Sequence, residues 1–281
     1  MNAGSRDPGP GARESEFTAS VGSTASDLGS SSDSVSSPIS CSSGSRVPGP
    51  GSRHRPESRL HLLYGGTFDP IHNGHLAIAR AARDAFGVPV RLMPAADPPH
   101  RPAPGADAQQ RCAMLALAIA DTPGLVLDLH ELHRVQARPG VASYSIDTVR
   151  ELRGELGAEA PLALLIGSDS FVGFNGWREW RALLEAAHLI VADRAGSGWE
   201  RAVPAELAQA VAGRWADTPQ ALTRAPGGRL WCLRQPLRSE SASLVRARIA
   251  AGEDWPALLP APVAAYIRDH GLYASGAARA G

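Results

Sequence analysis

Short apolar runs alternate along the chain with longer segments in which apolar residues recur every three or four positions. The short runs predict strands, several of them unbroken, as expected where a sheet is covered on both faces. These strands are expected at 60–64, 88–93, 125–129, 161–166, 188–192 and 230–233. The longer segments predict helices at 74–86, 106–121, 145–156, 178–186, 203–213, 241–251 and 261–270. Strands that alternate with helices indicate an α/β fold with a doubly wound parallel sheet.

The two ends of the chain lack this pattern. Residues 1–58 are rich in Ser, Gly and Pro and have almost no apolar clusters. Such a segment buries too little apolar surface to offset the entropy of ordering, so we expect a disordered tail. It also lacks the apolar core of a signal peptide. We therefore expect one domain at 59–274, followed by a short disordered tail at 275–281.

The composition excludes several classes of protein. The chain has 28 basic and 28 acidic residues, and this balance argues against a broad nucleic-acid or anionic-membrane surface. Every basic residue is arginine, which excludes a Walker-type phosphate loop and Schiff-base chemistry on lysine. The three cysteines form no CxxC pair, so we expect no structural zinc and no disulfide framework. No apolar run is long enough to span a membrane, and we expect a cytoplasmic protein.

The most informative segment follows the first predicted strand. Gly65, Gly66 and Thr67 form a turn between this strand and the helix at 74–86. The backbone N–H groups at the start of a helix are unpaired and can bind an anion. His72 and His75 then lie three residues apart in the first helical turn, on one side of it.

Three interpretations of the two histidines are open. Zinc would need further ligands at helical spacing, and the sequence has none nearby. Capping and packing of the helix is a second interpretation. Chemistry on a phosphate is favoured, because imidazole N–H groups beside a phosphate-binding turn can stabilise negative charge as it develops.

The other candidate residues also lie just after predicted strands. Because the carboxyl ends of parallel strands meet at one edge of the sheet, we expect these groups to converge there. The segments concerned are 94–101 after the second strand, 167–170 after the fourth and 193–194 after the fifth.

Several motifs of the chain resemble those of a known family. Residues 65–75, read as Gly-Gly-Thr-Phe-Asp-Pro-Ile-His-Asn-Gly-His, are similar to the signature of the nucleotidylyltransferase superfamily. The wider set of motifs resembles bacterial nicotinate-nucleotide adenylyltransferase and implies a Rossmann-like nucleotidylyltransferase fold. These motifs are Pro98 to Arg101, Ser143 to Thr148, Gly167 to Ser170, Trp177 to Trp180, Ala187 to Val191, Ser241 to Arg246 and Tyr266 to Tyr273, in family order.

The resemblance implies adenylyl transfer from ATP to nicotinate mononucleotide, giving deamido-NAD and pyrophosphate, with Mg²⁺ bound through the ATP phosphates. It implies His72, His75 and Arg246 as catalytic residues. Asp169 is expected at the ATP ribose or the adjoining backbone, or as a helix cap, and Arg194 at ATP or in solvent. The full set implied for ATP and its phosphates is Gly65, Gly66, Thr67, Phe68, His72, His75, Gly167, Asp169, Arg194, Ser243 and Arg246.

A second set is implied for the mononucleotide: Asp69, Arg101, Ser145, Thr148, Trp177 and Arg178. Trp177 is expected to stack on the pyridine ring or, alternatively, to be a core aromatic residue. Ser145 and Thr148 are expected at the pyridine carboxylate or as caps of their helix. The chain departs from the family pattern at Arg101, Ser145, Ser243, Ala242 and Glu240, and Glu240 brings a negative charge near the phosphate site unless it points to water.

Several alternatives stay open at this stage. The acceptor could be nicotinamide mononucleotide or phosphopantetheine, and the fold could serve as a non-catalytic nucleotide sensor. A tRNA-synthetase fragment is disfavoured because the chain lacks a lysine-rich motif. The sequence also leaves the oligomeric state open, a homo-oligomer included.

Overall fold

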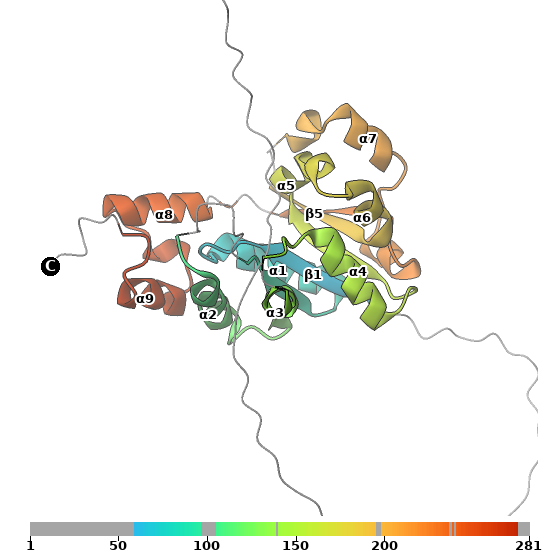
Figure 1. Cartoon of the computed structure of the whole chain (residues 1–281). Helices are drawn as coiled ribbons and strands as arrows, with labels where there is room; N and C mark the ends of the chain where they lie inside the picture. Colours follow the sequence, from blue (N-terminus) through green and yellow to red (C-terminus); the bar gives the residue numbers. More distant parts are fainter. Residues whose placement is uncertain are drawn as a thin grey trace, which may run out of the picture.

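A computed structural model describes residues 59–96, 105–138, 140–194, 198–235, 238 and 240–274. Its centre is a six-stranded parallel sheet (Figure 1). The strands are β1 (His61–Gly66), β2 (Val90–Pro94), β3 (Leu125–Leu127), β4 (Leu162–Gly167), β5 (His188–Arg194) and β6 (Leu230–Gln235). Their order is β3-β2-β1-β4-β5-β6, that of a doubly wound Rossmann-like sheet, and this confirms the predicted fold class.

The helices cover both faces of the sheet. They are α1 (Asn73–Phe86), α2 (Ala108–Ile119), α3 (His130–Ala137), α4 (Ser145–Leu156), α5 (Ser168–Val172), α6 (Trp180–Ala186), α7 (Ala205–Val211), α8 (Ala242–Ala251) and α9 (Ala261–Asp269). Figure 1 shows α8 and α9 together at one end of the molecule and α4 to α7 at the other. Within the described residues, none of these helices is long and apolar enough to cross a membrane.

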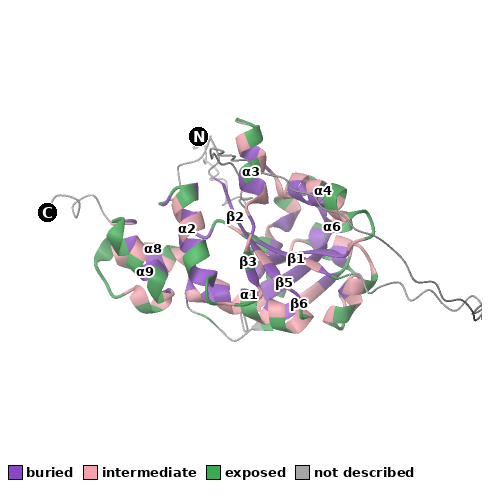
Figure 2. Cartoon of the chain, turned by 90° about the horizontal axis from the view of Figure 1, so that it is seen from below, coloured by how far each residue is buried: buried purple, intermediate pink, exposed green. Residues whose placement is uncertain are grey.

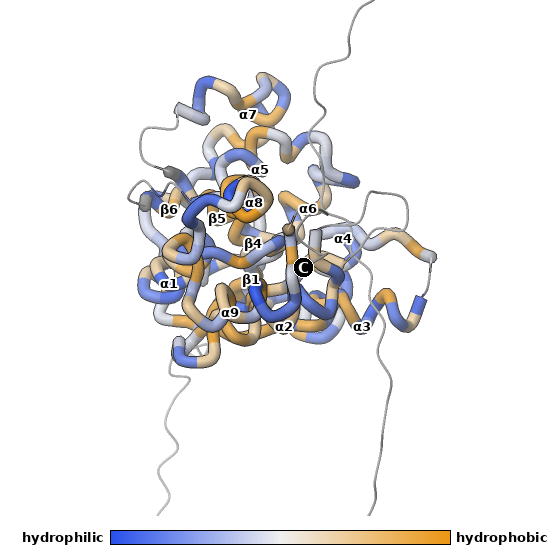
Figure 3. Tube along the Cα trace, turned by 90° about the vertical axis from the view of Figure 1, so that its left-hand side faces the viewer, coloured by the Kyte–Doolittle hydropathy of each residue, from blue (hydrophilic) through white to orange (hydrophobic). Residues whose placement is uncertain are grey.

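Alternate residues of each strand enter two separate cores. Leu62 and Tyr64 of β1 pack with α1, α2 and α9, whereas Leu63 packs with α4 and α6 on the opposite face. Because side chains alternate along a strand, this central strand is buried on both sides. In Figure 2 most of the sheet is purple, and many of the exposed residues lie on the outer sides of the helices. In Figure 3 hydrophobic and hydrophilic stretches alternate along the outer helices, as in α7.

The hydrophobic pattern predicts all six strands and seven of the helices, but two helices are missing from it. α5 has only five residues, and α3 has eight with few apolar ones. Glu131 of α3 is buried, so the inner face of this helix is not purely apolar. A short helix with a polar inward residue gives little periodic signal. The tails predicted at 1–58 and 275–281 lie outside the described residues.

Buried His188 at the start of β5 links stability to pH. Its Nδ1 accepts from the Arg229 N–H at 3.1 Å, and its Nε2 lies 2.9 Å from the Ala225 carbonyl, which requires a neutral ring. Burial, opposed by these backbone hydrogen bonds, lowers the pKa of His188 below 6.5. The unfolded chain therefore binds a proton near pH 6.5 that the folded chain does not. We expect the free energy of unfolding to fall as the pH drops from about 7 towards 5.

Urea denaturation of the wild type and of His188→Gln across this pH range checks the prediction. Glutamine offers a donor and an acceptor but does not titrate, so the variant should show a weaker pH dependence. An equal pH dependence in both proteins would contradict the assignment to His188.

Candidate active site

The glycine turn lies at the centre of the sheet. β1 pairs with β2 on one side and with β4 on the other. From β1 the chain adds β2 and β3 towards one edge of the sheet, and it then returns to add β4, β5 and β6 towards the other edge. Ligands of doubly wound folds bind at this point, outside the carboxyl ends of the strands. Gly65 and Gly66 end β1 there, and an added Cβ at Gly65 would meet nothing within 4 Å. The turn therefore opens a space where a ligand can approach the backbone.

His72 and His75 cap α1 through each other. The His75 N–H donates to Nδ1 of His72, and the His72 N–H donates to Nδ1 of His75, each over 3.4 Å. The two rings are stacked with their centroids 3.7 Å apart. Because each Nδ1 is an acceptor, the hydrogen of each neutral ring is on Nε2. The capping interpretation is thus confirmed, and it fixes the orientation of both rings. The phosphate interpretation is compatible with the cap and stays a prediction.

Gly74 makes room for this pair. A Cβ at this position would lie 3.0 Å from two atoms of the His72 ring and 3.4 Å from the Glu240 carbonyl oxygen. Glu240 precedes α8, so only a glycine lets α1 approach both the ring and the segment before α8. The glycine between the histidines is therefore required by close packing.

A buried arginine donates a hydrogen bond to the backbone of the glycine turn. Arg111 of α2 is fully buried, and its Nη1 donates to the Thr67 carbonyl over 2.7 Å. This places a positive charge behind the turn that is expected to bind phosphate, and a buried charge acts there with little screening. Sequence reasoning missed Arg111. The available signal was a single arginine directly before the apolar stretch 112–119 of this helix.

Asp69, expected to bind the mononucleotide, joins three parts of this chain. Its carboxylate accepts from the Gly105 and Ala106 N–H groups at 3.0 and 3.2 Å and from the Tyr273 hydroxyl at 2.6 Å. Burial, together with the nearby Asp69 charge, raises the pKa of Tyr273, which keeps its hydroxyl a donor. Asp69 is therefore a residue that fixes the turn to the C-terminal region, and contact with the mononucleotide stays a prediction.

Removing the Tyr273 hydroxyl tests this connection. A Cβ at Gly105 would lie 2.5 Å from the Tyr273 ring, so the ring packs tightly against this glycine. Tyr273→Phe keeps the ring and removes one hydrogen bond to a carboxylate. We expect a loss of about 1.5–3 kcal/mol in the free energy of unfolding by urea denaturation. Tyr266→Phe, on the α9 residue whose ring stacks on His270, is the control and should change it much less.

Arg246 approaches the same turn from α8. Its Nη1 donates to the Asp69 carbonyl over 2.5 Å and lies 3.8 Å from the Asp69 carboxylate. Its Nη2 is 3.5 Å from the Ser243 hydroxyl, one turn earlier on the helix. Arg246 therefore contacts Asp69, in the segment between β1 and α1 that precedes His72, and a shared phosphate site with the two histidines stays a prediction. Arg246 is partly exposed, so the guanidinium remains accessible to a ligand.

A second set of predicted residues lines a pocket on the other side of β1. Ser145, Thr148 and Trp177 are among its lining residues, with Gly65 at its border with the glycine turn. The Trp177 ring also packs against Phe174, at 5.2 Å between centroids. Arg178 lies over the Tyr144 ring, 4.5 Å from its centroid. Three of the residues expected at the mononucleotide thus share one pocket, and it adjoins the phosphate turn.

The remaining predicted residues are distributed as follows. Gly167 ends β4 and precedes α5, in whose first turn Asp169 is exposed to solvent rather than acting as the cap. Arg194 ends β5, so its backbone lies at the expected sheet edge. Arg101 lies outside the described residues. Glu240 does not point to water: its side chain is buried, with Oε1 3.5 Å from Arg238.

Comparison with known proteins identifies the family to which the chain belongs. The Cytidylyltransferase-like family matches residues 63–248. A protein of Stenotrophomonas maltophilia (strain K279a), named "Probable nicotinate-nucleotide adenylyltransferase", is 59% identical over 216 residues, which are 77% of this chain and 97% of that protein. A protein of the same name from Xylella fastidiosa (strain M12) is 48% identical over 214 residues, 76% of this chain and 96% of its own.

Solved structures share the fold at low identity. The nicotinic acid mononucleotide adenylyltransferase of Plasmodium falciparum complexed with APC aligns with a TM-score of 0.55 and 16% identity, over 76% of this chain and 97% of that one. The same enzyme complexed with NaAD aligns with a TM-score of 0.55 and 14% identity over the same shares. At this identity the likeness supports the Rossmann-like architecture alone.

Proposed function

Since this chain belongs to the nicotinate-nucleotide adenylyltransferases, within the Cytidylyltransferase-like family, we propose that it joins ATP to nicotinate mononucleotide at the turn between β1 and α1. The products are deamido-NAD and pyrophosphate, and the reaction is a step of NAD biosynthesis. One observation carries the assignment of the site: the capped pair His72 and His75 lies on the turn that Arg246 reaches from α8.

The chemistry requires no general base. An oxygen of the mononucleotide 5′-phosphate, largely ionised because its second pKa is about 6, attacks the α-phosphorus of ATP. A new P–O bond forms as the bond between the α-phosphorus and the bridging oxygen breaks, and pyrophosphate leaves with that electron pair. Catalysis then depends on aligning two anions and stabilising the charge on the transferring group.

The phosphate side of the site supplies donors for this charge. The N-terminal N–H groups of α1 and the Nε2–H groups of His72 and His75 would face the α-phosphate. Arg246, with Ser243 beside it, would bind the β- and γ-phosphates through its planar fork. Buried Arg111 would add positive charge behind Thr67. The histidines and the helix N-terminus would therefore act on the transferring phosphate, and Arg246 on the leaving group.

The acceptor side would use the pocket lined by Ser145, Thr148 and Trp177. The Trp177 ring would stack on the pyridine, and Arg178 would border it. The pocket shares Gly65 with the phosphate turn, so a mononucleotide bound there would direct its phosphate towards the turn. The pocket and the turn could thus hold the pyridine ring and the phosphate of one mononucleotide at the same time.

ATP is expected to enter as its magnesium complex. Among the described residues, no group of three His, Cys, Asp or Glu side chains is placed to hold a metal ion. Mg²⁺ keeps several waters and binds readily through substrate phosphates, so this donor set fits an ion carried by ATP. His72, His75 and Arg246 would then hold the phosphates while Mg²⁺ neutralises part of their charge.

Pyrophosphate release tests the proposal directly. The purified chain is given MgATP with nicotinate mononucleotide, nicotinamide mononucleotide or phosphopantetheine as separate acceptors, and kcat/KM is measured for each. We expect the nicotinate compound to give the highest value and phosphopantetheine to give no product. Turnover with phosphopantetheine and none with either mononucleotide would overturn the assigned substrate.

A further inference from the structure

Glu131 is a buried acid next to the pocket proposed for the pyridine ring. It belongs to α3, the helix that the hydrophobic pattern does not predict, and only 4% of its surface is exposed. It lines the same pocket as Ser145, Thr148 and Trp177. An acid at this place would oppose a bound pyridine carboxylate if it were charged, so its hydrogen bonds decide what the pocket can bind.

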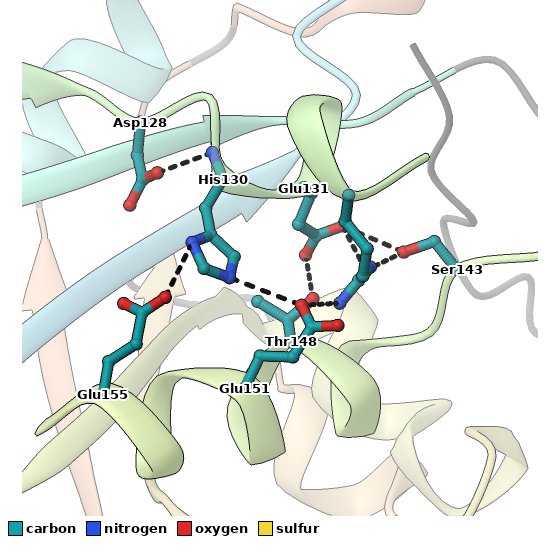
Figure 4. A network of polar contacts seen from close by, with 8 residues as sticks. Asp128, His130, Glu131, Ser143, Thr148, Glu151 and Glu155 are labelled. Carbon is teal, nitrogen blue, oxygen red and sulfur yellow. Dashed lines mark hydrogen bonds and ion pairs between the residues drawn. The ribbon is translucent and has the colours of Figure 1, made fainter. Parts of the chain in front are cut away.

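The two oxygens of Glu131 have different partners (Figure 4). The Thr148 hydroxyl donates to Oε1 over 2.6 Å. On the other side, the Ser143 hydroxyl donates to Oε2 over 3.4 Å, and the Arg134 guanidinium is also 3.4 Å from Oε2. Ser143 and Arg134 themselves are hydrogen-bonded to each other. Oε2 is therefore fixed as an acceptor, whereas the direction of the bond at Oε1 depends on where the proton is.

Thr148 has a single hydroxyl proton. When it is donated to an ionised Glu131, the hydroxyl offers only lone pairs to the pocket. When Glu131 carries the proton on Oε1, that proton is donated to Thr148, and the threonine proton is free to point into the pocket. An acceptor suits the N–H₂ of a carboxamide, and a donor suits a carboxylate.

We propose that Glu131 is a positioning residue that sets acceptor specificity by fixing the direction of the Thr148 hydroxyl. The inference rests on the proposed function and deepens it, since it assigns the choice between the nicotinate and nicotinamide mononucleotides to one hydrogen bond. Glu131 acts through Thr148, to whose hydroxyl it is hydrogen-bonded.

Burial favours the protonated acid at neutral pH. Burial is the dominant cause and raises the pKa of Glu131 to about 8; Asp128 adds to the rise, while Thr148, Arg134 and Ser143 oppose it. The charged and titratable groups around this carboxyl, Arg134 among them, also contact one another. These contacts join Arg91 with Asp128 at 2.7 Å, Arg134 with Glu151 at 3.2 Å, and His130 with Glu151 and Glu155 at 3.3 and 3.7 Å.

The preference for the nicotinate mononucleotide should depend on pH through this proton. Below pH 8 the pocket offers the Thr148 proton to the pyridine carboxylate. Above pH 8 Glu131 ionises and takes that proton, so the carboxylate meets lone pairs. The ratio of kcat/KM for the nicotinate mononucleotide to that for the nicotinamide mononucleotide should fall roughly tenfold or more between pH 7 and 9, the size of one hydrogen bond to a charged group. Effects on ATP binding cancel in this ratio.

Glu131→Gln replaces the titratable carboxyl group with an amide that does not ionise. Because Ser143 and Arg134 require an oxygen at the Oε2 position, the amide nitrogen takes the place of Oε1 and donates to Thr148. We expect this variant to keep the nicotinate preference and to lose its decline above pH 8. Thr148→Val should lower the preference at every pH, and Ser143→Ala, which alters a contact outside the pocket, should retain it.

The experiment measures this ratio from pH 6.5 to 9 in the wild type and the three variants, with thermal denaturation as a check of folding. A decline in Glu131→Gln equal to that of the wild type, or an unchanged preference in Thr148→Val, overturns the inference while the adenylyl transfer stands. The absence of product from the wild type with both mononucleotides overturns the proposed function and this inference with it.

Discussion

His72→Asn should lower kcat for adenylyl transfer by about 10²–10³-fold while leaving the protein folded. The imidazole Nε2–H is expected to donate to the α-phosphoryl group as its charge develops, and loss of one such donor has an effect of this size. Asparagine is a good helix cap, so its side-chain oxygen can still accept from the His75 N–H that now bonds to Nδ1. Steady-state pyrophosphate release and thermal denaturation measure the two effects separately.

His72→Ala is the comparison that isolates the cap. It should lose turnover to the same extent and also lose about 1 kcal/mol in the free energy of unfolding, because the His75 N–H loses its side-chain acceptor. Turnover of His72→Asn within about threefold of the wild type would show that the ring acts only as a cap, since the loss expected for one such donor is far larger.

Arg246→Ala should lower kcat/KM for ATP by about 10³-fold or more, the effect of removing an arginine that stabilises the charge of the transition state of phosphoryl transfer, here on the leaving β- and γ-phosphates. Arg246→Lys keeps the charge but loses the planar fork, so we expect an intermediate loss with a raised KM for ATP. The lysine also cannot reproduce both the donation to the Asp69 carbonyl and a bidentate contact with phosphate. Kinetics at varied MgATP with fixed mononucleotide give both constants.

Arg248 offers a matched control on the same helix. Its Nη1 donates to the Asp254 carbonyl over 2.9 Å, at the far end of α8 from the turn. Arg248→Lys should leave kcat and the KM for ATP close to the wild-type values. Equal losses in Arg248→Lys and Arg246→Lys would contradict a specific role of Arg246 and indicate a general effect on α8.

Much of the fold follows from local pattern. The apolar runs predict the strands because a central parallel strand is buried on both faces, and β1 and β4 meet this condition. Helix boundaries agree within one or two residues where a cap is visible, as at Asp107 before α2 and Gly87 after α1. The hydrophobic pattern does not predict α3, because its buried face includes the acidic residue Glu131. The partners of Glu131, Ser143 and Thr148, lie outside this helix.

In the active site, too, some features follow from local sequence and others depend on contacts between distant residues. The histidines and the glycine turn are contiguous, so the sequence indicates both the phosphate site and the helix that carries it. By contrast, the Asp69 contacts with Arg246 and Tyr273 span 177 and 204 positions in the chain. No local pattern reports such distances, and a charged residue in a helix, such as Arg111, reads as exposed until the packing is known.

The sequence by itself therefore determined the class of the sheet, the order of the motifs and the groups available for phosphate chemistry, because these depend on periodicity and on short-range spacing. Only the tertiary structure decided which nitrogen of His72 and His75 accepts the cap, that Arg111 lies under Thr67, and that Glu131 borders the pocket of Thr148. The physical reason is that hydrogen-bond direction and burial are set by partners brought together from distant elements.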